Sequence, residues 1–245
     1  MKLTTNSLRA IIIEFLGTFV IAFVTFWSFG LYRNKLLGYL DMALIQGMII
    51  GSMTWAGLAF SGAHFNPTIT ILKACLQEIS VPNACVYVAV QMLASFFGAL
   101  LAILTSVVQE KNAPSISFPH PEPGYTQFQC FFLEFFASFV LVLVYSATVL
   151  DRKAPSNIFG FAIGAVYALS FLAIGGSTGG CVNPIKVFGG HLVLFDFTNS
   201  GIYWLSTVTG GVFAGFYYDF FLRSLEADVD AFEDLDQEQA IETEK

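Results

Sequence analysis

The chain has 245 residues, of which 56% are apolar and only 12% charged, and its mean hydropathy is +0.69. Too few polar residues remain to cover a soluble domain of this size, so the composition excludes an ordinary soluble protein and indicates an integral membrane protein. The formal net charge of −7 says little about the membrane surface, because nine of the eighteen acidic residues follow Leu225. Nucleic acid is not an expected partner.

Six apolar segments follow one another along the chain. A helix needs roughly 20 predominantly apolar residues to cross the hydrocarbon core of a membrane. Segments of this kind lie at about 9–30, 38–59, 84–108, 127–150, 156–176 and 200–222. No small-residue cleavage pattern follows the first one, so we interpret it as a retained helix rather than a signal peptide. The pattern predicts an all-α membrane domain with six transmembrane helices over residues 1–225.

The loops between these segments predict the orientation of the chain. Basic residues are enriched in short cytoplasmic loops. If both ends are cytoplasmic, the inner side carries seven basic residues and the outer side three: Lys2, Arg9, Lys73, Arg152, Lys153, Arg223 and Lys245 against Arg33, Lys35 and Lys111. We therefore expect cytoplasmic N- and C-termini. Residues 226–245 are expected to form an acidic disordered tail, with a regulatory or partner-binding role as the alternative to simple solubility.

No motif for catalysis or metal binding accompanies the apolar segments. The four cysteines lie in or beside these segments and show no CxxC or His–Cys spacing: Cys75, Cys85, Cys130 and Cys181. We therefore expect no disulfide framework, zinc site or other cofactor. No Ser-His-Asp, Cys-His or phosphate-loop pattern is present in the sequence, so an enzyme is not expected.

An Asn-Pro pair lies between the second and third apolar segments. Ser61-Gly62-Ala63 provides a flexible approach, Asn66 is suited to cap a helix, and Pro67 is suited to its first position. Residues 68–76 then form a short apolar stretch. About nine helical residues span only ~14 Å. The segment is thus predicted to enter the membrane and return on the same side.

The second half of the chain repeats this pattern. Glu14-Phe-Leu-Gly-Thr-Phe-Val in the first span matches Glu134-Phe-Phe-Ala-Ser-Phe-Val in the fourth, and Asn183-Pro184 follows Glu134 at nearly the distance that separates Asn66 from Glu14. Repeat one covers about residues 9–110 and repeat two about 126–222. Each repeat holds three spans, so the second must be inverted in the membrane, and the two interrupted segments are expected to meet near the midplane.

The residues within these interrupted segments suggest a polar interior. A backbone that is not helical is tolerated at this depth only where it is buried in protein or lines a wet cavity. Glu14 and Glu134 are costly in lipid and should face inward, either as a proton relay or as structural acceptors. Small residues at helical spacing predict close helix packing: Gly47 with Gly51, Ser95 with Ala99, Gly160 with Gly164, and Gly211 with Gly215.

Together these residues resemble the aquaporin, or major intrinsic protein, family. The resemblance runs from about Arg9 to Leu222 and rests on motifs that occur in the family's order: Glu14, Ser61-Gly-Ala-His-Phe-Asn-Pro67, Gln91, Glu134, Gly160-Phe-Ala-Ile-Gly164, Gly180-Cys-Val-Asn-Pro184 and Tyr203-Trp204. It implies six tilted helices and two half-helices in an hourglass, assembled as a homotetramer of four pores. It also implies that Glu14, Glu134 and His64 brace the pore loops through hydrogen bonds.

The resemblance also implies how the pore works. The half-helices that start at Pro67 and Pro184 point their positive N-termini at the midplane, where Asn66 and Asn183 present amide donors. A water oxygen accepts from both, so its hydrogens turn outward and the proton wire is interrupted. Cations meet a positive field and find no substitute for their hydration shell.

The sequence departs from the family at several pore positions. Thr68 and Ile185 stand where the motif usually has alanine. The four filter positions correspond to Gln46, Phe171, Gly180 and Lys186, whereas arginine is usual at the last of them. Lysine keeps the positive charge but lacks the planar fork of arginine. The alternative is a lysine that extends to the outer interface and touches no permeant.

Three functions remain open at this stage. The first is a passive channel for water, with small neutral solutes such as ammonia, urea or hydrogen peroxide as further or main permeants. The second is a secondary transporter, which would need ion-coupling carboxylates at the midplane, and Glu14 and Glu134 are the only candidates for them. The third is a membrane scaffold with the same fold and a closed pore. Expected partners are water, small neutral solutes and membrane lipid.

Overall fold

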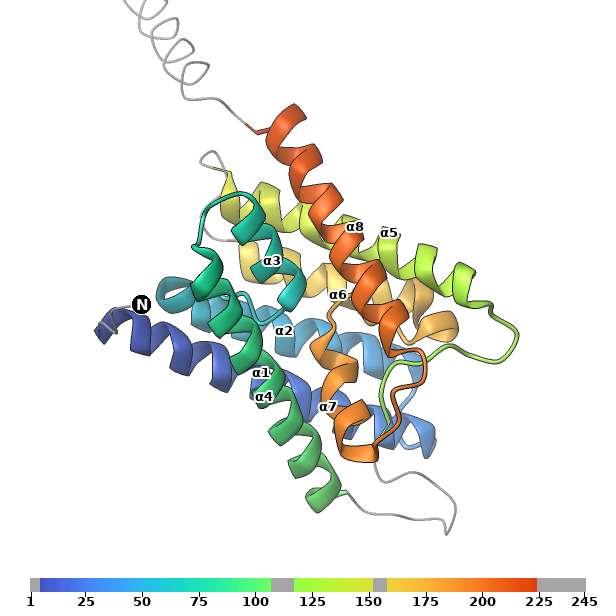
Figure 1. The fold of residues 1–245 in the computed structure, drawn as a ribbon. Helices are drawn as coiled ribbons and strands as arrows, with labels where there is room; N and C mark the ends of the chain where they lie inside the picture. Colours follow the sequence, from blue (N-terminus) through green and yellow to red (C-terminus); the bar gives the residue numbers. More distant parts are fainter. Residues whose placement is uncertain (1–4, 107–116, 152–157, 224–245) are drawn as a thin grey trace, which may run out of the picture.

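The computed structural model describes residues 5–106, 117–151 and 158–223, which form helices and loops with no strand among them. Within these residues, six helices are long: α1 (Thr5–Arg33), α2 (Tyr39–Ser61), α4 (Val81–Thr105), α5 (Gln127–Tyr145), α6 (Phe159–Thr178) and α8 (Ser200–Phe221) (Figure 1). Two are short, α3 (Pro67–Cys75) and α7 (Ile185–Leu194), and the π-helix η1 (Ser146–Leu150) continues α5. The predicted acidic tail, residues 226–245, lies outside the described residues.

Each predicted span corresponds to a long helix whose ends differ from the prediction by a few residues. In the described part of the chain, five helices are long and apolar enough to cross a membrane: α1, α2, α4, α5 with η1, and α6. The sixth predicted span, α8, is 22 residues long but less apolar. Small and hydroxyl residues on its buried face explain this, namely Ser206, Thr207, Gly210 and Gly211.

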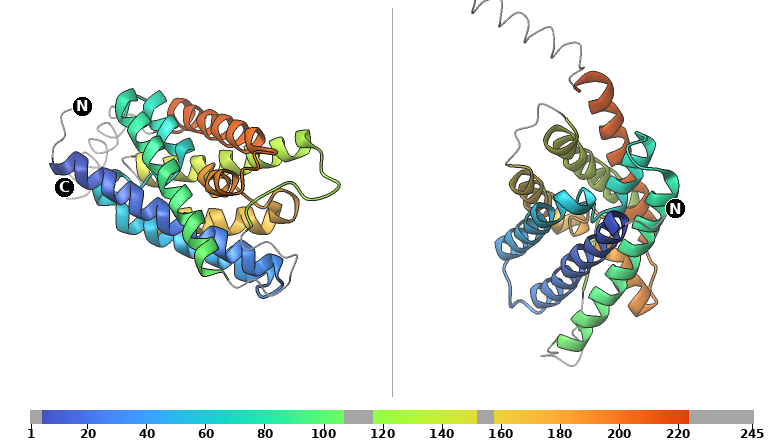
Figure 2. Two further views of the ribbon diagram at one scale, coloured as in Figure 1. Left: turned by 60° about the horizontal axis from the view of Figure 1, so that its bottom comes forward. Right: turned by 90° about the vertical axis from the view of Figure 1, so that its left-hand side faces the viewer.

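The two halves of the fold pack in matching pairs. α1 packs against α2 and α4, and in the same way α5 packs against α6 and α8. Each short helix lies between the last long helices of the two halves, because α3 and α7 both contact α4 and α8. In the left view of Figure 2, α7 (orange) lies among the longer helices, and it contacts α1, α4 and α8. Equivalent helices of the two halves thus make equivalent contacts, as expected of an inverted repeat.

The halves join where α2 crosses α6, and glycines allow the two backbones to touch. An ideal Cβ atom at Gly47 would lie 2.6 Å from the carbonyl oxygen of Gly164, and one at Gly51 would lie 2.6 Å from that of Gly160. No side chain fits at these distances. The close packing predicted from the spacing of these glycines is confirmed, and its reason is the approach of small residues in adjoining helices.

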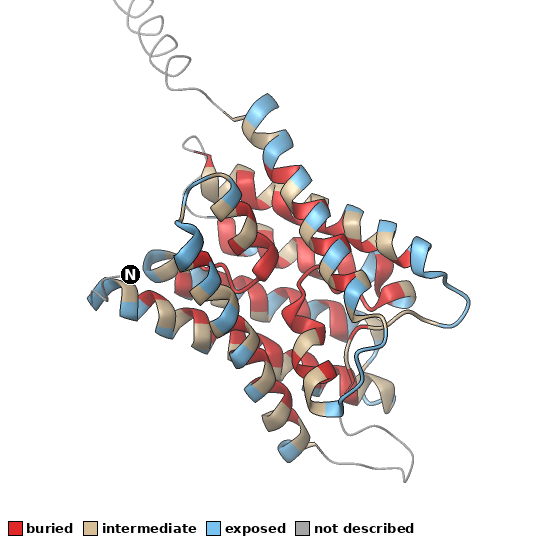
Figure 3. Ribbon diagram, viewed as in Figure 1, coloured by how far each residue is buried: buried red, intermediate tan, exposed pale blue. Residues whose placement is uncertain are grey.

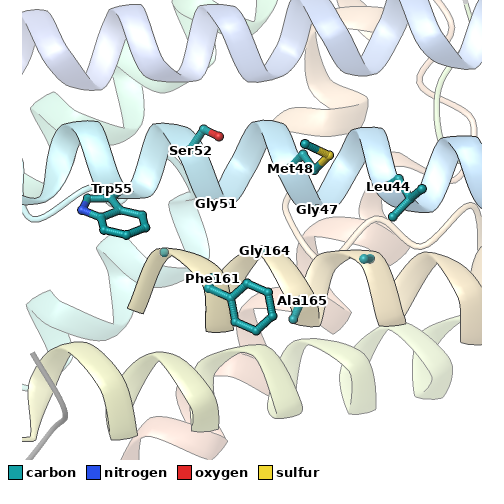
Figure 4. Close-up of a pocket in the computed structure, with 11 residues that line it drawn as sticks. Leu44, Gly47, Met48, Gly51, Ser52, Trp55, Phe161, Gly164 and Ala165 are labelled. Atoms are coloured by element: carbon teal, nitrogen blue, oxygen red, sulfur yellow. The ribbon is translucent and has the colours of Figure 1, made fainter. Parts of the chain in front are cut away.

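A groove follows the outer side of this crossing. It has a volume of about 310 Å³ and runs between the two helices from Leu44 to Trp55 on α2, with Phe161 and Ala165 on α6 (Figure 4). Met48 and Phe161 are 70% and 76% exposed. Figure 3 shows the same trend over the whole fold, with buried residues on the inner faces of the helices and exposed ones outside. An apolar exterior of this kind is suited to lipid or to another apolar protein surface.

Candidate functional site

Two loops bring the Asn-Pro motifs into the middle of the helices. α2 ends at Gly62 and α6 ends at Gly179, both with left-handed backbone angles (φ of 81° and 82°) that reverse the chain direction. Glycine adopts this conformation without the steric cost of a Cβ atom. The loops then return to the start of α3 and α7, so each Asn-Pro pair lies at a helix N-terminus deep inside the fold.

The side chain of each asparagine accepts a hydrogen bond from the start of the short helix that follows it. The Oδ1 atom of Asn66 accepts a hydrogen bond from the backbone N–H of Thr68 at 2.9 Å, and that of Asn183 accepts from the N–H of Ile185 at 3.2 Å. Because each oxygen is held by its own helix, each Nδ2 amide is directed away from it. Both side chains are almost fully buried, and both therefore present donors to the centre of the molecule.

Glu14 of α1 holds the first loop. Its Oε1 atom accepts hydrogen bonds from the hydroxyl of Ser61 at 2.6 Å and the backbone N–H of His64 at 2.9 Å. Its Oε2 atom accepts from the N–H of Phe65 at 2.9 Å and from the amide of Gln91 at 2.8 Å. A buried carboxylate surrounded by four donors is well compensated for its loss of water. It fixes the loop directly before Asn66.

Glu134 of α5 has the same relation to the second loop. Its Oε1 atom accepts from the hydroxyl of Thr178 at 2.6 Å and the N–H of Cys181 at 2.8 Å, and its Oε2 atom accepts from the N–H of Val182 at 2.8 Å. The side chain is fully buried. The two carboxylates that match in sequence thus make matching contacts in the structure.

The residue before each asparagine adopts a strained backbone conformation. Phe65 and Val182 both have a φ of 45°, in a region that side chains rarely occupy, least of all β-branched ones. This angle turns each carbonyl toward the opposite loop. The Nδ2 of Asn66 donates to the Val182 carbonyl at 3.1 Å, and that of Asn183 donates to the Phe65 carbonyl at 2.9 Å. The loops are therefore joined by a reciprocal pair of hydrogen bonds.

The structure brings three of the four predicted filter positions together. The Nζ atom of Lys186 donates to the carbonyl of Gly180 at 2.9 Å, and an ideal Cβ atom at Gly180 would lie 3.0 Å from the Cα atom of Phe171. Lys186 is fully buried, so its side chain does not extend to an exposed surface of the chain. Phe171 packs among the rings of Phe29, Tyr32 and Tyr39.

The fourth position, Gln46, is held by the first helix. Its Oε1 atom accepts from the hydroxyl of Thr25 at 3.1 Å, and its Nε2 atom lies 3.4 Å from the hydroxyl of Ser28 as a donor. Its side chain is fully buried. Both ends of this amide thus have partners on α1, which the sequence did not reveal.

The side chains of His64 and Thr68, which flank Asn66 and Pro67, pack against neighbouring helices. The Nδ1 atom of His64 is 3.0 Å from the hydroxyl of Thr70, and its ring packs edge-on against Tyr87. The extra bulk of Thr68 is accommodated by α8, because its methyl group occupies the space that a side chain at Gly211 would need. The half-helix therefore retains its position despite the departure from alanine.

One further residue at the centre has no counterpart in the sequence prediction. Tyr167, one turn before Phe171 on α6, receives a hydrogen bond from the Nδ2 of Asn66 at 3.0 Å. Its ring also lies under the Lys186 ammonium, with 5.6 Å between the nitrogen and the ring centroid. The sequence offers one indication of this position: Tyr167 lies four residues before the predicted filter residue Phe171, and residues four apart lie on the same face of a helix.

Comparison with known proteins agrees with this geometry. Residues 2–218 match the family described as Major intrinsic protein. The chain is 31% identical over 234 residues to a probable aquaporin, TIP5-1, of Arabidopsis thaliana, covering 92% of this chain and 90% of that protein. It is 30% identical over 224 residues to the lens fiber major intrinsic protein of Lithobates pipiens, covering 87% and 81%.

A solved structure has the same fold. The aquaglyceroporin from Plasmodium falciparum superimposes with a TM-score of 0.76 at 22% sequence identity, covering 88% of this chain and 97% of that one. At this identity the likeness establishes the hourglass fold alone. Together with the family match over nearly the whole described chain, it leads to one conclusion: this chain belongs to the major intrinsic protein, or aquaporin, family.

Proposed function

We propose that this chain is a passive membrane channel for water that also admits small neutral solutes and excludes protons and ions. The observation that carries the proposal is the reciprocal pairing of the two loops, in which Asn66 and Asn183 are each oriented by a hydrogen bond from the start of their own helix. Their amides offer only donors to the centre. A water molecule that enters between them accepts with its oxygen and turns its hydrogens away.

The charges around this point oppose the passage of cations. α3 and α7 direct their N-termini, with the positive ends of their dipoles, at the asparagines. The Lys186 ammonium adds a full positive charge beside the second loop. A cation would meet this field after losing its water shell, and no carboxylate oxygen is free to replace that shell because Glu14 and Glu134 are occupied by the loops.

The proposed roles of the site residues follow from these contacts. Asn66 and Asn183 orient water, and Pro67 and Pro184 start the two half-helices. Gln46, Phe171, Gly180 and Lys186 form the outer filter, and Glu14, Glu134 and His64 brace the loops. All of these residues belong to one proposed transmembrane domain, residues 1–225, which consists of two repeats.

We also propose a homotetramer with cytoplasmic N- and C-termini. The exposed apolar groove between α2 and α6 supports assembly, since its exposed rings and aliphatic chains would be covered by a second copy. The distribution of basic residues supports the orientation. Chemical crosslinking in membranes and protease access to the C-terminal segment test these two points separately.

Stopped-flow light scattering of proteoliposomes tests the channel itself. Vesicles with the purified protein should shrink faster than protein-free vesicles under an osmotic gradient, and the rate should depend only weakly on temperature. Parallel runs with glycerol, urea and ammonia define the solute range, and a pH-sensitive dye inside the vesicles reports proton leakage. Shrinkage equal to that of empty vesicles, with no solute crossing faster, would refute the proposal and favour a closed scaffold.

A further inference from the structure

Tyr167 occupies the point at which the two asparagines converge. Its hydroxyl receives the hydrogen bond from Asn66, and the side chain of Asn183 reaches the same oxygen. An oxygen that accepts from the Asn66 amide beside Asn183 has the place that a permeating water needs. The Tyr167 hydroxyl therefore replaces water at this position, and both hydrogens of the Asn66 amide are used, one by Tyr167 and one by the Val182 carbonyl.

The ring of Tyr167 fills the passage on either side of this oxygen. Toward the filter it contacts the Lys186 ammonium, which is bound in turn to Gly180. On its other side lies a cavity of about 10 Å³, which Tyr167 lines together with His64 and Asn183. This volume is roughly the least that holds one water molecule. Tyr167 is 2% exposed, and its side chain contacts both this cavity and the filter residue Lys186.

Two of the other pore residues, Phe171 and Gln46, have partners outside the pore loops. Phe171 packs among three aromatic rings, and its backbone carbonyl accepts from the Tyr39 hydroxyl at 2.7 Å. Gln46 is tied to α1 at both ends of its amide. The ring of Tyr167 packs in the hydrophobic core, while its polar contacts with the Asn66 amide and the Lys186 ammonium are individually weak.

We propose that Tyr167 is the constriction that determines the conductance of this pore, because its hydroxyl occupies the Asn66 amide that would otherwise bind a permeating water and its ring lies against the filter lysine. The proposal deepens the channel function stated above and rests on it. Water crosses the midplane when the Tyr167 side chain leaves the Asn66 amide, so the fraction of open pores depends on how firmly this one side chain is bound.

Substitution of Tyr167 in the full-length protein tests this assignment. Tyr167→Val removes the ring and the hydroxyl but leaves a residue compatible with an apolar helix. We expect its water permeability per protein to be about tenfold above that of the wild type, which corresponds to ~1.4 kcal/mol in the equilibrium between closed and open pores. Leu169→Val is the matched control, because Leu169 lies two residues further along α6 and is 62% exposed on the outside.

Tyr167→Phe isolates the hydroxyl and serves if the valine variant does not fold. It keeps the ring but frees the Asn66 amide for water, so we expect a smaller rise in the same direction. Circular dichroism and gel filtration confirm the fold of each variant. A folded Tyr167→Val protein, or in its place Tyr167→Phe, with permeability no higher than the wild type would overturn the proposal.

The outcomes separate this inference from the channel function. If the wild type conducts and both Tyr167 variants equal it, the inference fails while the channel function stands. If the wild type matches empty vesicles with every solute but Tyr167→Val conducts, the channel function of the wild type is refuted, while the inference that Tyr167 closes the pore is supported. If neither conducts, both proposals are refuted.

Discussion

Glu134→Gln is the most direct test of how the second pore loop is held. The substitution keeps the size of the side chain but replaces one oxygen by an NH₂ group. The oxygen that remains can still accept from Thr178 and Cys181, as Oε1 does in the native protein. The NH₂ group then faces the backbone N–H of Val182, which now donates to Oε2. Two donors would oppose each other in a fully buried site.

The size of the effect follows from these three hydrogen bonds. A buried N–H left without an acceptor costs ~1–3 kcal/mol, and the other two bonds each lose about 1 kcal/mol when their acceptor is no longer charged. The sum is about 4 kcal/mol. For a chain of this length, 1 kcal/mol lowers the melting temperature by roughly 2–4 °C, so we expect a decrease of about 10 °C. The loop before Asn183 should also shift, with reduced water permeability.

Thermal unfolding in detergent and stopped-flow permeability measure these two effects on the same preparation. Glu122→Gln is the matched control, because Glu122 pairs with Arg33 in a partly exposed position where ion pairs contribute little. If Glu134→Gln melts no lower than this control, the bracing role is refuted. If it melts normally but removes a dependence of flux on the proton gradient, Glu134 belongs to a proton relay and the chain is a transporter.

Three further substitutions test the filter and the packing around it. Lys186→Arg should narrow the solute range while water still passes, and unchanged permeability for every solute would show that Lys186 is outside the filter. Gly164→Val should lower thermal stability by about 1–3 kcal/mol through overpacking, because a Cβ atom at Gly164 would lie 2.5 Å from the Gly47 carbonyl; Gly201→Ala, in open space, is its control. Gly211→Ala should also destabilise the protein, and adding Thr68→Ala should restore part of the loss in a double-mutant cycle.

The features that could be predicted from the sequence are those specified by short stretches of it. Asn66 and Pro67 indicated the start of α3, and the structure begins this helix at Pro67. In the second half the prediction was equally close, because α7 begins at Ile185 where the sequence indicated a half-helix that starts at Pro184. Capping by an asparagine and the fixed angle of proline act within a few residues, so no distant contact can change them.

The contacts between distant segments were only partly predictable. The spacing of Gly47 and Gly51 indicated a close approach but not its partner, which the structure identifies as α6. Gln46 was placed in the filter by counting from Asn66, yet the direction of its amide depends on Thr25 and Ser28 of α1. Counting residues from Asn66 predicts where a residue lies along the pore axis. Its hydrogen-bond partners depend instead on which helix packs beside it.

Tyr167 shows most clearly why the site could not be completed from sequence. In an apolar helix, a tyrosine is usually a core residue whose hydroxyl finds any available carbonyl, and Tyr145 of the same cavity does this by donating to Gly62. Tyr167 instead accepts from Asn66, which is 101 residues away in the chain. The donors of Asn66 are oriented by a helix cap that would exist whether or not Tyr167 were present. Because the start of its own helix orients each asparagine amide, the amide can donate to a water molecule or to any other oxygen that lies between the two loops. The permeability of this pore therefore depends on whether water or the Tyr167 hydroxyl is bound there.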